Sequence, residues 1–232
     1  GLVNSGLVPT GPGGVSHMIE LPNRGKRSVG LDLKSDEGRD VLLQIAARSD
    51  VFLTNFMPDV RSSLGIDVED IRAVNPDIIY VRGSGQGQRG PERDKGGFDG
   101  SAFWGRVVAD IATPGDRDRP VSPPGPAFGD LLGGLTIAGG ISAALFHRER
   151  TGEALVVDNS LMSTAMWATS ASLMAASLFG LDSIPKMTRH DMPNPLVGDY
   201  QTKDGRFVTL MMLQADRLWP DLVTKIGHPE LL

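Results

Sequence analysis

The sequence predicts an α/β protein, because short apolar strands alternate with helical patterns along its first half. Residues 27–33, 50–54 and 77–82 have the apolar runs or alternation typical of strands. Between them, residues 34–46 and 58–64 carry apolar side chains at helical spacing. Strands separated in this way by helices favour a Rossmann-like parallel sheet with helices on both faces.

The rest of the chain continues the alternation. The elements predicted after the third strand are a glycine-rich loop over 83–90, helices over 98–112 and 130–150, a strand over 155–158, a long apolar helix over 159–180, a hairpin within 198–213 and a helix over 216–226. The hairpin is placed by Asp204-Gly205, which suits a tight turn.

Prolines and composition divide the chain into parts. We expect a large domain over residues 1–182, a linker over 183–195 that contains Pro185, Pro193 and Pro195, and the start of a second, smaller α+β domain over 196–232. The first residues resemble a loop without an opening strand, and the last follow closely on a helical segment. Both ends therefore predict a fragment of a longer protein.

Composition restricts the classes of function. A net charge of −5 gives no basic footprint, so we expect no nucleic-acid partner. The absence of cysteine excludes disulfides and thiolate chemistry, and fits a cytoplasmic location. The most apolar stretch, residues 161–181, is interrupted by serines and threonines, so we expect no membrane partner. No His, Asp or Glu set has metal-ligand spacing, so no metal is expected.

Asp130 is the acid that stands out. It follows Gly129 and precedes an apolar, glycine-studded helical pattern. One interpretation is a helix N-cap, whose carboxylate accepts hydrogen bonds from the first free amides. The other is a carboxylate nucleophile, kept ionised at the helix N-terminus beside glycines that allow a substrate close to the backbone.

The glycine-rich loop offers a second, weaker motif. Gly85, Gly87 and Gly90 match GxGxxG. A dinucleotide fingerprint opens a helix directly, whereas Pro91-Glu92-Arg93-Asp94 follows here. A plain loop is therefore favoured over a nucleotide site.

Several short segments, taken together and in order, resemble the class III CoA-transferase family, also called the CaiB/BaiF family, and its formyl-CoA transferase-like members. The matching segments are Asn23-Arg24-Gly25-Lys26-Arg27-Ser28, Leu31-Asp32-Leu33-Lys34, Asn55-Phe56-Met57-Pro58, Leu64-Gly65, Asn75-Pro76, Gly83-Ser84-Gly85-Gln86-Gly87, Gly129-Asp130, Gly152-Glu153, Asn194-Pro195-Leu196 and Asp204-Gly205-Arg206. The resemblance implies that this chain lacks the family's first strand and helix and most of its small domain.

The resemblance implies CoA transfer between an acyl-CoA and a carboxylic acid, with Asp130 as covalent nucleophile. It places Leu31 and Lys34 near the adenine and ribose phosphate of CoA, and Asn55 and Phe56 in contact with CoA at the end of a strand. Arg61 is a further candidate for the phosphate charges. Coenzyme A would enter as a substrate, with no tightly bound cofactor, and the full-length protein would form an interlocked homodimer.

The sequence departs from the family in two places. Where the family has an arginine about seven residues after the phenylalanine, this chain has Ser63. Whether Arg61 takes the place of that arginine is left open by the sequence. The segment matching the family's glycine-rich lid, residues 187–194, has no glycine run. The substrate acid therefore need not be formate or oxalate.

Three alternatives stay open. The family's racemases use a histidine–aspartate pair, but the matching position is Phe98, which cannot shuttle a proton; His190-Asp191 is a poor substitute in a linker. Asp158, at a strand–helix junction, is a helix N-cap, a hydrogen-bonded structural acid or a reserve nucleophile. The third alternative is that the chain is an inactive CoA-binding scaffold.

Overall fold

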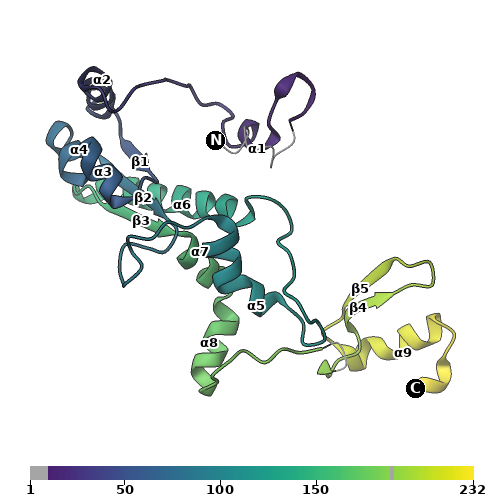
Figure 1. Cartoon of the computed structure of the whole chain (residues 1–232). Coiled ribbons are helices and arrows are strands. Elements are labelled where there is room, and N and C mark those ends of the chain that lie inside the picture. The colour runs from purple at the N-terminus through teal and green to yellow at the C-terminus, as the bar shows by residue number, and fades with distance from the viewer. Residues whose placement is uncertain (1–9, 189–190) are drawn as a thin grey trace. The chain divides into compact units, whose positions relative to one another are not determined.

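The computed structural model describes residues 10–188 and 191–232 (Figure 1). Its elements are η2 (Pro12–Gly14), α1 (His17–Glu20), α2 (Asp36–Ala46), β1 (Val51–Thr54), α3 (Pro58–Leu64), α4 (Val68–Val74), β2 (Ile79–Ser84), the π-helix η3 (Asp99–Val108), α5 (Ala109–Ala112), α6 (Phe128–Thr151), β3 (Val156–Ser160), α7 (Leu161–Ala168), α8 (Ser170–Phe179), β4 (Val197–Gln201), β5 (Phe207–Met211), α9 (Ala215–Lys225) and η5 (Pro229–Leu231).

The chain forms two compact units. The first ends at Ala109 and resumes over Ser122–Ser170; the second comprises Asp110–Val121 and Ala171–Leu232. The domain boundaries predicted from the sequence, after residues 182 and 195, stay predictions.

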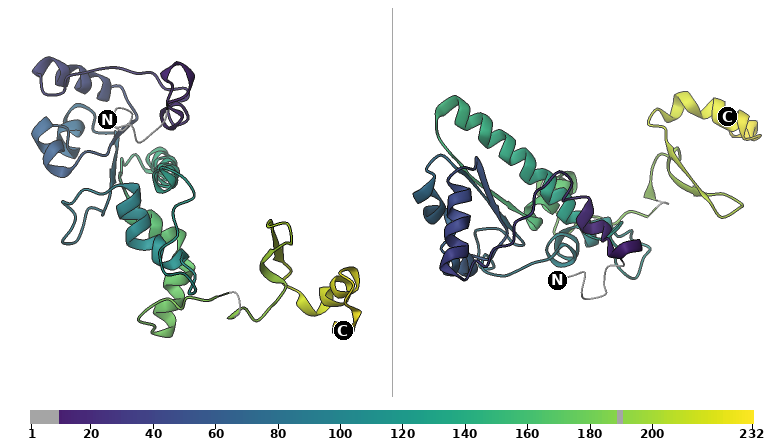
Figure 2. Two further views of the ribbon diagram at one scale, coloured as in Figure 1. Left: turned by 45° about the vertical axis from the view of Figure 1, so that its right-hand side comes forward. Right: turned by 90° about the horizontal axis from the view of Figure 1, so that it is seen from above.

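The first unit contains a parallel sheet in the order β1-β2-β3. Val51 pairs with Ile79, and Tyr80 pairs with Val156, so β2 lies in the middle. Figure 2 shows α6 on one face of this sheet and α2, α3 and α4 on the other. The predicted α/β class, with a parallel sheet and flanking helices, is confirmed.

Two apolar cores lie on opposite faces of β2, because successive side chains of a strand point in opposite directions. Ile78 and Tyr80 pack with Ile71 and other residues of the α2–α4 layer. Ile79 and Val81 pack instead against Ala144 of α6. Residues 78–81 are all fully buried, which makes β2 the centre of the unit.

Local signals set the helix ends in the α2–α4 layer. The Ser35 hydroxyl caps α2 by accepting a hydrogen bond from the Gly38 amide at 3.0 Å. Asp67 and Asp70 form a capping box at the start of α4. Helix α3 ends at Gly65, whose φ of 62° is the left-handed conformation that glycine adopts readily.

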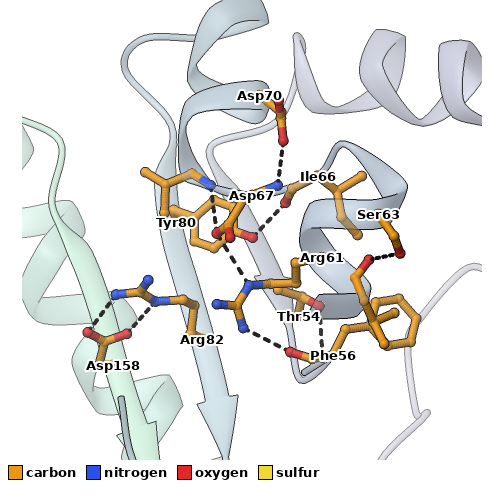
Figure 3. A network of polar contacts seen from close by, with 12 residues as sticks. Thr54, Phe56, Arg61, Ser63, Ile66, Asp67, Asp70, Tyr80, Arg82 and Asp158 are labelled. Atoms are coloured by element: carbon orange, nitrogen blue, oxygen red, sulfur yellow. Dashed lines mark hydrogen bonds and ion pairs between the residues drawn. The ribbon is translucent and has the colours of Figure 1, made fainter. Parts of the chain in front are cut away.

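A polar network ties β2 to the α3–α4 connection (Figure 3). The Tyr80 hydroxyl donates to the Ile66 carbonyl at 2.6 Å. The Arg61 guanidinium donates to the Phe56 carbonyl at 2.9 Å and pairs with Asp67 at 3.3 Å. Burial raises the pKa of Tyr80 to about 12, with the Asp67 charge a further cause, so the hydroxyl stays a hydrogen-bond donor.

Two predicted elements are wrong. Residues 27–32 have no strand, and Val29 is 67% exposed, so the alternating side chains find no strand partner and no core. The long helix predicted over 159–180 is two helices separated at Thr169. The Thr169 hydroxyl donates to the Ala165 carbonyl at 2.8 Å, a local bond of the kind that bends helices.

Helix α6 has a length and composition that would allow it to cross a membrane, the one described helix of which this is true. Core helices of soluble proteins meet the same test. In this structure α6 packs against β2 and β3 through Ile137, Ile141 and Ala144. The expected lack of a membrane partner stays a prediction.

The second unit contains the predicted hairpin. Strands β4 and β5 pair antiparallel, with Gln201 opposite Phe207. The turn between them includes Gly205 at φ 83°, and the Asp204 carboxylate pairs with Arg206. Helix α9 follows, and the Trp219 indole donates to the Leu231 carbonyl at 2.9 Å.

Replacing Tyr80 with phenylalanine should lower the free energy of unfolding by about 1–2 kcal/mol, because the buried Ile66 carbonyl would lose its donor. Urea unfolding of both proteins measures the difference. Tyr80→Phe with unaltered stability would contradict a structural role for this hydrogen bond.

Candidate functional site

A cavity of about 800 Å³ lies where β1 and β2 reach their carboxyl ends. This is the edge of a parallel sheet at which ligands commonly bind. Its lining residues are Leu53, Thr54, Asn55, Phe56, Met57, Gly83, Ser84, Gly85, Gly96, Gly97, Phe98, Asp130, Gly133, Gly134, Ile137, Asn159 and Leu161. Asp130 is the one charged side chain among these described residues.

Asp130 is not the N-cap of its helix, so that interpretation of the sequence is wrong. Helix α6 begins at Phe128, which puts Asp130 in the first turn. The N-cap position is Ala127, with φ 56° and ψ 28°, and its methyl group cannot accept a hydrogen bond. The Gly129 amide donates instead to Asp99 Oδ1 at 2.9 Å, across 30 positions of sequence. The Asp130 carboxylate is therefore not needed as the cap of α6.

The surroundings of Asp130 disfavour its charge. Partial burial in the cavity wall raises the pKa of the Asp130 carboxyl above its usual value, and the negative charge of Asp99 raises it further. The Asp130 residue is nevertheless exposed to solvent by its accessible surface, so the burial that acts on its carboxyl is incomplete. A carboxylate with a raised pKa is more basic, and so more nucleophilic, than an ordinary surface aspartate.

Glycines bring the cavity walls close together. An added Cβ at Gly85 would lie 2.6 Å from the Gly97 Cα, so the two backbone segments touch. Asn159 supplies a polar wall, with Nδ2 3.2 Å from Thr164 Oγ1 and 3.4 Å from the Gly133 carbonyl. The glycine-rich loop follows β2 without opening a helix, as expected for a plain loop.

Gly133 and Gly134 line the same cavity as Asp130. Both residues lie inside α6, beyond its first turn. At such positions each amide donates to the carbonyl four residues earlier. These two amides are therefore engaged in the helix and are not free to stabilise an oxyanion.

The structure brings together only some of the residues predicted to contact CoA. Asn55 and Phe56 line the cavity, and the Phe56 amide donates to Thr54 Oγ1 at 3.1 Å. Leu31 and Lys34 lie outside its lining. The Arg61 side chain is only 4% exposed and holds the Phe56 carbonyl and Asp67, which leaves it little surface for a phosphate.

The reserve acid Asp158 does not reach the cavity. It forms a two-point ion pair with Arg82 of the neighbouring strand, at 2.6 and 2.9 Å (Figure 3). The N-cap of α7 is Ser160, whose hydroxyl accepts from the Ser163 amide at 2.9 Å. Asp158 is therefore a hydrogen-bonded structural acid, one of the roles that the sequence left open.

None of the described histidines lines the cavity, and His190 lies outside the described residues. Phe98 occupies the position where an acid–base histidine would be needed, and it is 82% exposed. Over residues 10–188 and 191–232, no group of three or more His, Asp or Glu side chains could hold a metal ion.

A family model described as CoA-transferase family III matches residues 6–232. The chain belongs to this family. The crystal structure of a CaiB/BaiF family protein from Brucella suis has a TM-score of 0.77 at 29% identity, over 89% of this chain and 53% of that one.

Family III relatives with named activities align over nearly the whole chain. Cinnamoyl-CoA:phenyllactate CoA-transferase of Clostridium sporogenes is 30% identical over 215 residues, covering 92% of this chain and 52% of that protein. Acetyl-CoA:oxalate CoA-transferase of Acetobacter aceti is 33% identical over 225 residues, covering 94% and 55%. The chain thus spans about half the length of the curated relatives it matches.

Gly129→Ala should lower the free energy of unfolding by about 1–3 kcal/mol, because the new Cβ would lie 2.3 Å from Phe103 Cγ and 2.4 Å from Asp99 Oδ1. Gly139→Ala in the same helix meets nothing within 4 Å and should be neutral or slightly stabilising. Equal urea midpoints for the two variants would show that the contact between η3 and α6 is not tight.

Proposed function

We propose that the intact protein transfers coenzyme A from an acyl-CoA to a carboxylic acid, with Asp130 as covalent nucleophile. The observation that carries the proposal is an Asp130 carboxyl that is not used as a cap, in the wall of a cavity at the carboxyl ends of parallel strands. The named relatives, each a CoA-transferase acting on organic acids, support the same class of reaction.

The chemistry needs a carboxylate in the position of Asp130. Its oxygen attacks the thioester carbonyl, and collapse of the tetrahedral adduct expels CoA thiolate and leaves an aspartyl mixed anhydride. The thiolate then attacks the aspartyl carbonyl, which gives an aspartyl-CoA thioester and releases the first acid as its carboxylate. The acceptor carboxylate runs the same two steps in reverse, which forms the new acyl-CoA and regenerates Asp130.

Each intermediate conserves the energy of an activated acyl group, so the overall exchange is nearly thermoneutral. The protein must therefore exclude water from the anhydride and thioester. The cavity wall is suited to this task, because Leu53, Met57 and Ile137 provide apolar surface near the reacting carboxyl.

Contacts with CoA are part of the proposal. Asn55 and Phe56, which line the cavity, are placed to meet the substrate. No lysine or arginine is among the described lining residues, so the phosphates would lie outside the cavity. Leu31 and Lys34 are proposed to lie near the adenine and the ribose phosphate of CoA. A phosphate contact by Arg61 stays a prediction, while its bond to the Phe56 carbonyl already shapes the cavity rim.

A homodimer and a cytoplasmic location are also proposals. Large apolar side chains are exposed on α6 and α7, including Leu135 at 71%, Phe146 at 67% and Trp167 at 79%. Exposed apolar surface of this kind favours burial against a further protein surface. Light scattering of the intact protein would test the oligomeric state.

Incubation of the intact protein with a panel of acyl-CoAs and hydroxylamine should convert the activated aspartyl group to a hydroxamate. We expect the corresponding mass increase on the peptide that contains Asp130, only when acyl-CoA is present. Asp130→Asn should abolish the increase and lower turnover by at least about 1,000-fold.

Asp158→Asn is the matched control, since that acid lies outside the cavity lining and should leave the modification in place. A hydroxamate on Asp158 would refute the assigned nucleophile. If no acyl-CoA gives any modification, while CoA still raises the melting temperature, the protein is a binding scaffold. Exchange of the substrate α-proton would instead indicate a racemase.

As the solution is acidified, the rate of transfer should begin to fall at a pH above the usual titration range of aspartate. The attacking species is the carboxylate, and the pKa of Asp130 is raised by burial and by Asp99. Single-turnover formation of the adduct, measured from pH 4 to 8, reports this acidic limb. A limb at or below the ordinary aspartate pKa would contradict the predicted environment of Asp130.

A further inference from the structure

The hydrogen bond between Asp99 and Gly129 joins two elements at the first turn of α6. Asp99 is the first residue of η3 and is half-buried. Its Oδ1 accepts from the Gly129 amide at 2.9 Å. An anion at this place meets the free amides and the positive end of the helix dipole, the favourable arrangement for a helix cap.

The local sequence of α6 cannot provide that cap. The N-cap residue, Ala127, has no acceptor side chain. Without Asp99, the acid nearest to the free amides along the sequence is Asp130 itself. An Asp130 carboxylate turned back onto the helix end would be held by those amides, which would lower its basicity and withdraw it from the cavity.

Close packing keeps Asp99 in place. A Cβ on Gly129 would overlap Asp99 Oδ1 and the Phe103 ring, so only glycine lets the carboxylate reach the amide. Phe103 is 1% exposed and meets Phe128 edge to face at 6.1 Å, while Trp104 meets the same ring at 6.5 Å. The π-helix η3 therefore contacts the start of α6 through both a carboxylate and aromatic rings.

We propose that Asp99 is a positioning residue for acyl transfer: it caps α6 in place of Asp130 and thereby presents the Asp130 carboxylate to the cavity. This inference rests on the function proposed above. It assigns Asp99 no contact with substrate; Asp99 acts through the Gly129 amide and through its charge.

The charge of Asp99 gives the proposal a second measurable consequence, a change in the pKa of Asp130. Among the described elements that pack against α6, the other charged side chains near this end pair elsewhere: Arg106 with Glu92, and Arg82 with Asp158. Helix α7 has no charged side chain. Removal of the Asp99 charge should therefore lower the pKa of Asp130, since Asp99 is the charged group that raises it.

Two variants separate the cap from the charge. Asp99→Asn keeps an oxygen acceptor for Gly129 but removes the charge, so adduct formation at neutral pH should stay within a few-fold of wild type while the acidic limb moves to lower pH. Asp99→Ala removes both, and kcat should fall about tenfold or more with KM for acyl-CoA within about twofold. Asp40→Asn, an equal charge change on exposed α2, is the control and should leave both unchanged.

Amide exchange of Gly129 and the carboxyl titration of Asp130, both followed by NMR, test the same inference without turnover. We expect faster Gly129 exchange in Asp99→Ala, and a lower Asp130 pKa in Asp99→Asn. The proposal is overturned if Asp99→Asn changes neither the acidic limb of the pH–rate profile nor the titration of the Asp130 carboxyl. A wild-type kcat in Asp99→Ala also overturns it. If Asp99→Ala does not fold, the Asp99→Asn titration decides.

The two proposals fail in different ways. If wild type forms no adduct with any acyl-CoA, the proposed transferase function fails, while the Gly129 exchange and the Asp130 titration still report on Asp99. If wild type forms the adduct and the Asp99 variants behave like Asp40→Asn in every measurement, the positioning role alone fails.

Discussion

Complete burial of the β2 segment from Ile78 to Val81 is the constraint on which the first unit depends. One strand fills two cores, so a slip of one residue would exchange its two faces and disrupt both. The register is fixed as a result, with Leu53 opposite Val81 and Val81 opposite Val157. A fixed register sets where the strands end, and the cavity walls begin at those ends.

Much of this unit could be predicted from sequence, because the signals are local. The apolar runs of β1 and β2, the Pro58 that opens α3 and the Gly65 that ends it need no distant partner to be recognised. Residues 27–33 show the limit of such signals. Their alternation is a strand pattern, but a strand also needs a neighbour with which to pair, and the sequence does not say whether one is present.

The site was predictable in outline and not in detail. Asp130 was identified because it follows a glycine and precedes an apolar, glycine-studded helical pattern, and the structure places it in the wall of a cavity. Its relation to the helix was wrong, since the group that caps α6 comes from Asp99, 30 residues earlier. Arg61 was a candidate for the CoA phosphates, yet its side chain is buried and pairs with Asp67. A contact between segments 30 residues apart decides the first case and burial of the side chain decides the second, and periodicity carries no record of either.

The tight space around Gly129 links three positions that are distant or separate in sequence. Any side chain at 129 would collide with Asp99 and Phe103, and a change at either of those residues would alter the room available at 129. We therefore expect these positions to covary during evolution and to be inherited as a unit. Among the described residues of the cavity lining, Asn55 to Met57 form no hydrogen bond with α6. That part of the lining is free to diverge independently, so the shape of the cavity can change without alteration of the packing at the start of α6.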